Sequence, residues 1–206
     1  MRTEEIKIYK FEELGEEAKK IAREWYKESM SNDFQAESEI ITENLKETAT
    51  DEMHNMIKDI NIAWSLSNCQ GDGVSFTGKI ITENITSFLK LCLGRDLLAS
   101  EVEVANFVDY IEFTRDKYEI YVHKNTVKVT LEVDVTEYEY KNHYKKDEIN
   151  NILDKFEEAI ESKRIEVCNK LEYQGYSEIE YIYSDDSVDD NIICNEYEFD
   201  EDGTKY

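Results

Sequence analysis

The sequence predicts an α+β fold in which an antiparallel β-sheet carries helices mainly on one face, within a single domain. In residues 127–135, valine or leucine alternates with polar residues, as in an antiparallel strand with one wet face. Residues 60–67 and 74–80 are two further alternating runs, and a short Gly-Asp-Gly segment between them is typical of a β-hairpin. Four longer stretches repeat apolar residues every three to four positions, as amphipathic helices do.

The helical periodicity predicts four main helices and a short one. Gly15 occupies the N-cap position of the first helix, and Glu16 and Glu17 lie in its first turn, where the helix dipole favours acids. Gly94 suits the end of the third helix, and Gly175 is expected to stop the longest. The predicted ranges are 15–29, 34–57, 82–93 and 146–173, with the short helix within 96–106.

The alternating runs predict the strands of the sheet. The main sheet is expected to include residues 60–67, 74–80, 118–123 and 127–136, with Lys124 and Asn125 as the last turn. Residues 6–9 and 108–113 resemble further strands. We see no internal repeat and no linker, so we expect one domain over residues 1–206.

The charge balance is the most unusual feature of the composition. The 206 residues hold 24 Lys and Arg against 48 Asp and Glu, a formal net charge of −24. Such a chain repels phosphate backbones and anionic membrane surfaces, so we expect no direct binding of nucleic acid or membrane. The acidity either maintains solubility or forms a surface for a basic partner protein.

The C-terminal segment, residues 177–206, concentrates this charge. It holds eleven acids against Lys205 alone, yet isoleucine, tyrosine and phenylalanine are mixed in. Purely acidic tails lack such residues, so we expect a helical turn and a strand near 196–199 folded onto the domain. The candidate binding carboxylates are Asp185, Asp186, Asp189, Asp190, Glu196 and Glu198. We expect lysine in place of the four aspartates to leave the fold largely intact, as exposed charges contribute little.

A second candidate site is the loop from Gln70 to Ser75. Glycines let its backbone approach a ligand, Asp72 could act as acceptor or base, and Gln70 and Ser75 could donate hydrogen bonds. The simpler interpretation is that Asp72 and Gly73 only make the turn. No nucleophile, phosphate-loop or metalloprotease motif occurs, and His54, His123 and His143 are scattered, so we expect no cofactor and no metal.

The cysteines and the chain start indicate a cytoplasmic protein. Cys69, Cys92, Cys168 and Cys194 form no Cys-x-x-Cys pair, and the first residues contain no apolar signal region. We therefore expect free, mostly buried thiols in a reducing cytosol.

Three segments carry a resemblance to a known family. They are residues 6–19, residues 67–76 with the sequence Ser-Asn-Cys-Gln-Gly-Asp-Gly-Val-Ser-Phe, and residues 195–203. These resemble a family of small acidic proteins encoded by bacteriophages and prophages, some loosely labelled antitoxin-like. Gly15 stands where the family pattern has serine. The resemblance implies a phage gene product in a bacterial host cytoplasm, and no catalytic residue carries over.

Two functions follow as hypotheses. The first is a non-enzymatic protein that inhibits or modulates a basic host protein through acidic surface, as DNA-mimicking anti-CRISPR or anti-restriction proteins do. The second is a small-ligand or nucleotide-binding protein, or an enzyme, that uses the Gln70–Ser75 loop. The first predicts an association that weakens steeply with salt.

Overall fold

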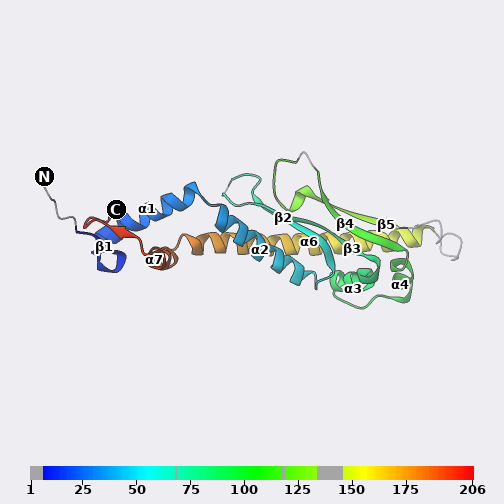
Figure 1. The fold of residues 1–206 in the computed structure, drawn as a ribbon. Helices are drawn as coiled ribbons and strands as arrows, with labels where there is room; N and C mark the ends of the chain where they lie inside the picture. The colour runs from blue at the N-terminus through cyan, green and yellow to red at the C-terminus, as the bar shows by residue number, and fades with distance from the viewer. Residues whose placement is uncertain (1–6, 68, 117–118, 134–145) are drawn as a thin grey trace. The chain divides into compact units, whose positions relative to one another are not determined.

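A computed structural model of the chain describes residues 7–67, 69–116, 119–133 and 146–206 (Figure 1). These residues pack as two compact units. One contains the residues up to 41 together with 176–206, and the other contains residues 42–175. Helices α2 (Gln35–Glu52) and α6 (Lys146–Ile182) each contribute residues to both units. That the two units together form one domain stays a prediction.

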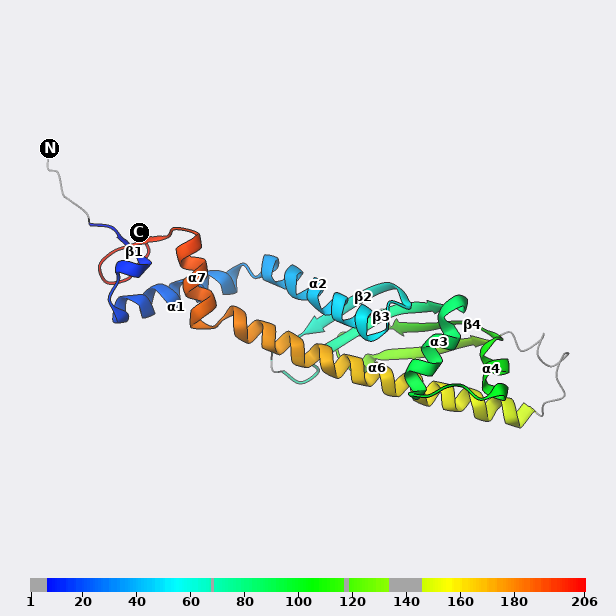
Figure 2. The same ribbon diagram turned by 90° about the horizontal axis from the view of Figure 1, so that it is seen from below.

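The unit of residues 42–175 contains the main sheet. Its strands lie in the order β2 (Ile57–Ser65), β3 (Gly73–Ile81), β4 (Val108–Arg115) and β5 (Val127–Val133), and every neighbouring pair is antiparallel. Helices α3 (Thr82–Leu93) and α4 (Ala99–Ala105) lie together on one side of the sheet (Figures 1 and 2). The α+β class, the antiparallel sheet and the helices mainly on one face are therefore confirmed.

The core of this unit lies between the sheet and the helices. Phe113 of β4 contacts Phe76 of β3 and Phe88 of α3, with ring centroids 5.3 Å and 6.3 Å away. Buried residues of α6 complete this core: Phe156, Ile160, Val167, Cys168 and Leu171. On β5 the side chains alternate in exposure as the sequence predicts, because successive strand residues point to opposite faces.

The other unit is built on α1 (Glu16–Asn32) and α7 (Asp185–Cys194). A two-stranded sheet of β1 (Tyr9–Lys10) and β6 (Glu198–Phe199) joins the two ends of the chain. A 3₁₀ turn, η1 (Phe11–Glu13), leads from β1 towards α1. The buried cluster consists of Phe11, Leu14, Ala18, Ala22, Val188, Ile192 and Phe199. The C-terminal segment thus folds as a helix and a short strand, as the apolar residues within it predict.

The structure corrects two element boundaries. The helix predicted over 34–57 ends at Glu52, and β2 begins at Ile57, because His54 and Asn55 take left-handed φ angles of 50° and 59°. Contrary to the prediction, Gly175 does not stop the longest helix but lies inside α6. A side chain there would start 2.4 Å from Cδ1 of Leu66, so the glycine permits close packing instead.

One predicted strand is wrong. Residues 119–123 form no strand; residue 118 lies outside the described residues, as do 134–136 of the other predicted strand. The partner of β5 is β4, with which it shares a register from Val108↔Val133 to Arg115↔Val127. A 3₁₀ turn, η2 (Lys124–Thr126), precedes β5, and the amide of Val122 donates to the carbonyl of Gly71 instead of to a strand.

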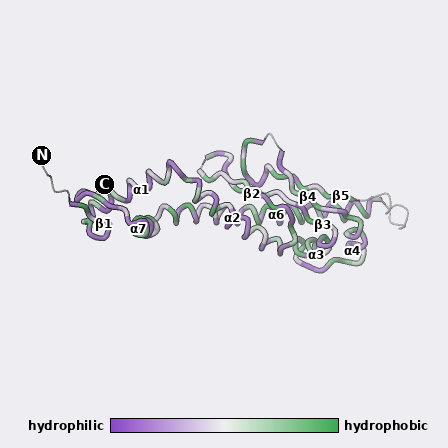
Figure 3. The backbone as a smooth tube through the Cα atoms, viewed as in Figure 1, coloured by the Kyte–Doolittle hydropathy of each residue, from purple (hydrophilic) through white to green (hydrophobic). Residues whose placement is uncertain are grey.

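The hydropathy pattern of the helices is mixed. Polar and apolar residues alternate along α6 (Figure 3). No helix in the described residues is both long and apolar enough to span a bilayer.

Candidate functional site

Asp72 is the hydrogen-bond centre of the Gln70–Ser75 loop. Its carboxylate accepts hydrogen bonds from Oγ of Ser65 at 2.7 Å and from the amides of Ser67 at 2.6 Å and Cys69 at 2.7 Å. The Cys69 amide and then the Ser65 hydroxyl lower the pKa of Asp72, because they stabilise the ionised form. Both carboxylate oxygens are thus used within the loop.

The neighbouring segment covers the same loop. Gly71 has a φ of 95°, and a side chain there would begin 2.2 Å from the ring of Tyr121. Ser75 is buried in β3, whereas Gln70 is exposed. Of the three side chains predicted to bind a ligand, only Gln70 is therefore free of packing and of a structural hydrogen-bond network.

We predict that Asp72→Asn loosens the loop without changing the rest of the unit. The amide can accept fewer hydrogen bonds than the carboxylate, so the Ser67 and Cys69 amides should exchange faster with solvent. In the wild-type chain the folded pKa of Asp72 lies below its ordinary value of 3.8. Its stabilising effect is therefore complete above pH 3.8 and is lost as the pH falls through the folded pKa. NMR titration and amide exchange measure both effects; unchanged exchange in the variant would contradict the assignment.

Two of the candidate aspartates form ion pairs with side chains of α1. Asp189 forms two hydrogen bonds of 2.6 Å with Nε and Nη2 of Arg23, and Asp185 forms one of 2.7 Å with Nζ of Lys27. The Lys27 hydrogen bond lowers the pKa of Asp185, and the Asp189 hydrogen bond raises the pKa of Arg23. These pairs join α7 to α1, so we revise the expectation for two of the four positions and predict that lysine at Asp185 and Asp189 removes contacts between the two helices.

The other candidate acids differ in their surroundings. Asp186 and Asp190 are exposed and have no ion pair or hydrogen bond with another described residue. Because they are four residues apart on α7, they share one face of the helix. Glu198 lies 3.2 Å from Nζ of Lys10, while Glu196 is exposed and only its carbonyl oxygen accepts from that lysine.

The remaining reactive groups do not assemble. Within the described residues, no three or more His, Cys, Asp and Glu side chains lie close enough to hold a metal ion. All four cysteines are unpaired, but Cys69 and Cys194 are exposed, which corrects the expectation of mostly buried thiols. Burial raises the pKa of Cys92 to about 12 and of Cys168 to about 11, so both thiols are protonated near neutral pH.

The histidines do not form a common site in the described residues. Nδ1 of His123 accepts from the amide of Asn125 at 3.1 Å and so caps η2. His54 lies in the turn after α2, with its left-handed φ angle, and His143 lies outside the described residues.

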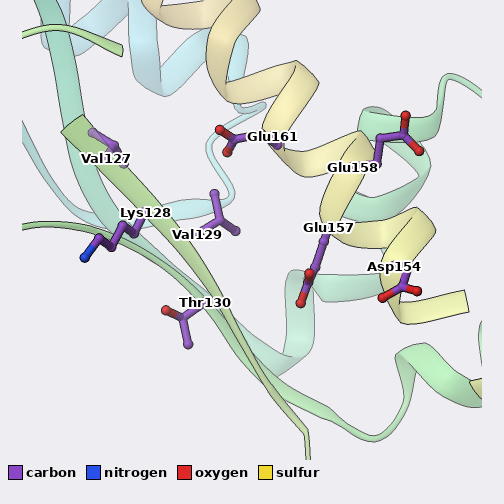
Figure 4. A pocket seen from close by; sticks show the side chains of 8 residues that line it. All are labelled: Val127, Lys128, Val129, Thr130, Asp154, Glu157, Glu158 and Glu161. Carbon is purple, nitrogen blue, oxygen red and sulfur yellow. The ribbon is translucent and has the colours of Figure 1, made fainter. Parts of the chain in front are cut away.

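A groove between β5 and α6 is a site that the sequence analysis missed. It has a volume of about 620 Å³, and Figure 4 shows residues of the strand across from acids of the helix. The lining consists of Val127, Lys128, Val129 and Thr130 from β5 and Asp154, Glu157, Glu158 and Glu161 from α6. The sequence shows that these acids have helical spacing, but only the tertiary structure shows that they lie opposite β5.

Comparison with known proteins places the chain in a family. No curated protein and no solved structure is significantly similar to the chain. A family model described as a domain of unknown function, DUF8835, matches residues 25–189. The match includes the Gln70–Ser75 loop, the acids of the groove, and Asp185, Asp186 and Asp189. Because the model covers more than half of the sequence, the chain belongs to the DUF8835 family.

Proposed function

We propose that the chain is a phage-encoded, non-enzymatic binding protein that inhibits or modulates a basic host protein through acidic surface. The observation that carries this proposal is the net charge of −24 together with exposed carboxylates, such as those of Asp186 and Asp190, that have no ion pair with another described residue. Unpaired surface acids attract a basic partner and steer its approach. A host defence enzyme with a basic nucleic-acid groove is the class of partner that such a surface fits.

The Gln70–Ser75 loop is less suited to be a binding or catalytic site than the acidic surface. Its carboxylate is occupied by three internal hydrogen bonds, its serine is buried and its glycine is covered by Tyr121. A ligand would have to replace these contacts before it could use them. The charged surface needs no such rearrangement, and we therefore place the function there.

The proposal is tested by capture of host proteins with the full chain as bait, followed by mass spectrometry and a salt series. The variant Asp186→Lys/Asp190→Lys should lose the partner, because it reverses two free carboxylates on one face of α7. The control Glu24→Lys/Glu28→Lys makes the same charge change on exposed positions of α1. Equal capture by wild type and both variants would refute this surface as the site, and salt-independent capture would refute charge as the cause.

We predict that Asp185→Lys/Asp189→Lys instead destabilises the fold of its own unit. Arg23 and Asp189 are 18% and 25% exposed, so the variant places an added ammonium beside a largely buried guanidinium. We expect a loss of about 2–3 kcal/mol in the free energy of unfolding, since a charge-assisted pair is replaced by like charges.

Chemical denaturation measures the difference between the two pairs of aspartates. The variant Asp186→Lys/Asp190→Lys should stay within about 0.5 kcal/mol of wild type, as exposed and unpaired charges contribute little. Equal stability of the two double variants would show that the Arg23 and Lys27 contacts contribute nothing.

A further inference from the structure

We propose that the groove between β5 and α6 binds an extended, basic segment of a partner protein, which adds to β5 as a fifth strand. The groove lies wholly within the unit of residues 42–175 and is a different surface from the α7 acids. The inference therefore shares with the proposed function only the basic character of the partner.

The first argument is the open edge of the sheet. β5 is the last strand in the order β2-β3-β4-β5, and within the described residues no backbone hydrogen bond reaches its outer side. Unpaired amides and carbonyls along a strand are a template for a further strand. The groove runs along residues 127–130 of this edge, so the space beside the template is open.

The second argument is the charge of the opposite wall. Asp154, Glu157 and Glu158 are exposed and have no hydrogen bond or ion pair with another described residue. Glu161 differs, because Nε of the buried Arg164 donates to its carboxylate at 2.8 Å. Figure 4 shows Glu157 and Glu161 on the side of α6 that faces β5, whereas the carboxylate of Glu158 points away from the strand. The carboxylates of Asp154 and Glu157 are thus available to cations that enter the groove.

The spacing of the wall suits an extended chain. Asp154 and Glu161 are seven residues apart on α6, about 10.5 Å along the helix axis at 1.5 Å per residue. Side chains on one face of a strand repeat every two residues, or about 6.8 Å. Two lysines or arginines at alternate positions of an added strand can therefore both face the acids, while β-branched residues between them face away.

The same charges disfavour other occupants. A nucleic acid would bring phosphates against four carboxylates, which repel it. A second copy of this chain, paired through its own β5, would bring a second acidic helix to the interface. Lys128 on the edge also discourages non-specific strand pairing. A basic extended segment can both hydrogen-bond with the backbone of β5 and form ion pairs with the acids of α6.

The test uses the full chain and a fluorescein-labelled peptide of alternating lysine and valine, about seven residues long. Fluorescence anisotropy should show binding that Asp154→Lys/Glu157→Lys weakens by about tenfold or more. The matched control Glu43→Lys/Glu47→Lys makes the same charge change on exposed positions of α2 and should weaken binding by about threefold at most. The variant Asp186→Lys/Asp190→Lys should leave the peptide affinity within the same limit, which separates this site from the α7 surface.

Backbone pairing is tested by a second peptide with the same charges, in which alternate amides are N-methylated. It should bind about tenfold more weakly, because it cannot complete a strand ladder. Hydrogen exchange of residues 127–133 should slow when the unmodified peptide binds. Failure of the unmodified peptide to bind, equal affinity of the two peptides, or equal effects of the two acid-to-lysine pairs would each overturn the proposal. Circular dichroism of every variant establishes that α6 is retained.

Discussion

Replacement of Gly203 by valine is expected to destabilise the unit built on α1 and α7 by about 4 kcal/mol. Gly203 is buried and has a φ of 91°, a conformation that branched residues rarely adopt. A side chain at this position would begin 2.1 Å from the carbonyl oxygen of Ala18. That oxygen belongs to the backbone of α1 and cannot move aside as the end of a flexible side chain could. The loss combines backbone strain with displacement of the C-terminal turn from α1.

Hydrogen exchange read by mass spectrometry localises this effect. Protection in residues 16–32 and 185–199 should fall strongly, because the turn is held by the bond from the Gly203 amide to the carbonyl of Asp200 and by the Phe199–Lys205 bridge. The control is Gly15→Ala, where φ is −71° and no atom lies within 4 Å of the added carbon. A Gly203→Val protein with wild-type stability would show that the turn does not pack against α1 as described.

Replacement of Arg164 by alanine is expected to cost about 3 kcal/mol in the unit of residues 42–175. Arg164 is only 1% exposed, donates twice to Glu161 and donates once to the carbonyl oxygen of Lys124. Alanine removes these bonds and leaves a cavity beneath η2. The loss should appear in urea denaturation and as faster exchange around residues 124–133.

Arg164→Met separates the two contributions. Methionine fills much of the volume without a charge, and buried ion pairs are often replaced by apolar residues at little cost. We expect this variant to lose about 1 kcal/mol. It also frees Glu161, so its affinity for the lysine-valine peptide should rise if the groove binds that peptide. Losses of equal size in both variants would show that the hydrogen bonds of the guanidinium, rather than its volume, hold η2.

Sequence periodicity was a sound guide to the helices and to most strands. Residues 82–93 form α3 as predicted, because the i, i+3, i+4 spacing is set by helix geometry within the segment itself. The single-sided alternation of β5 was predicted for the same reason. The failure at residues 119–123 has a different cause. The sequence suggested a tight hairpin between residues 118–123 and 127–136, but β4, which is more distant in the sequence, pairs with β5 instead.

The Gln70–Ser75 loop and the acids of α7 differed in how well their contacts could be predicted from the sequence. That Asp72 would serve the turn was one of the interpretations of a Gly-Asp-Gly segment, and its three hydrogen bonds come from residues within seven positions. The distinction between Asp185 or Asp189 and Asp186 or Asp190 was not predictable. It depends on Arg23 and Lys27, which lie more than 150 residues away in the sequence.

By itself, then, the sequence determined the acidic character of the chain, its helices and the alternating strands. These follow from the composition and from the spacing of apolar residues within each segment. Only the tertiary structure decided which carboxylates are paired, which strand ends the sheet and that α6 places a row of acids beside that edge. Those properties depend on contacts between distant segments. The packing of whole helices and strands determines which residues contact each other, and this cannot be derived from the pattern within one segment.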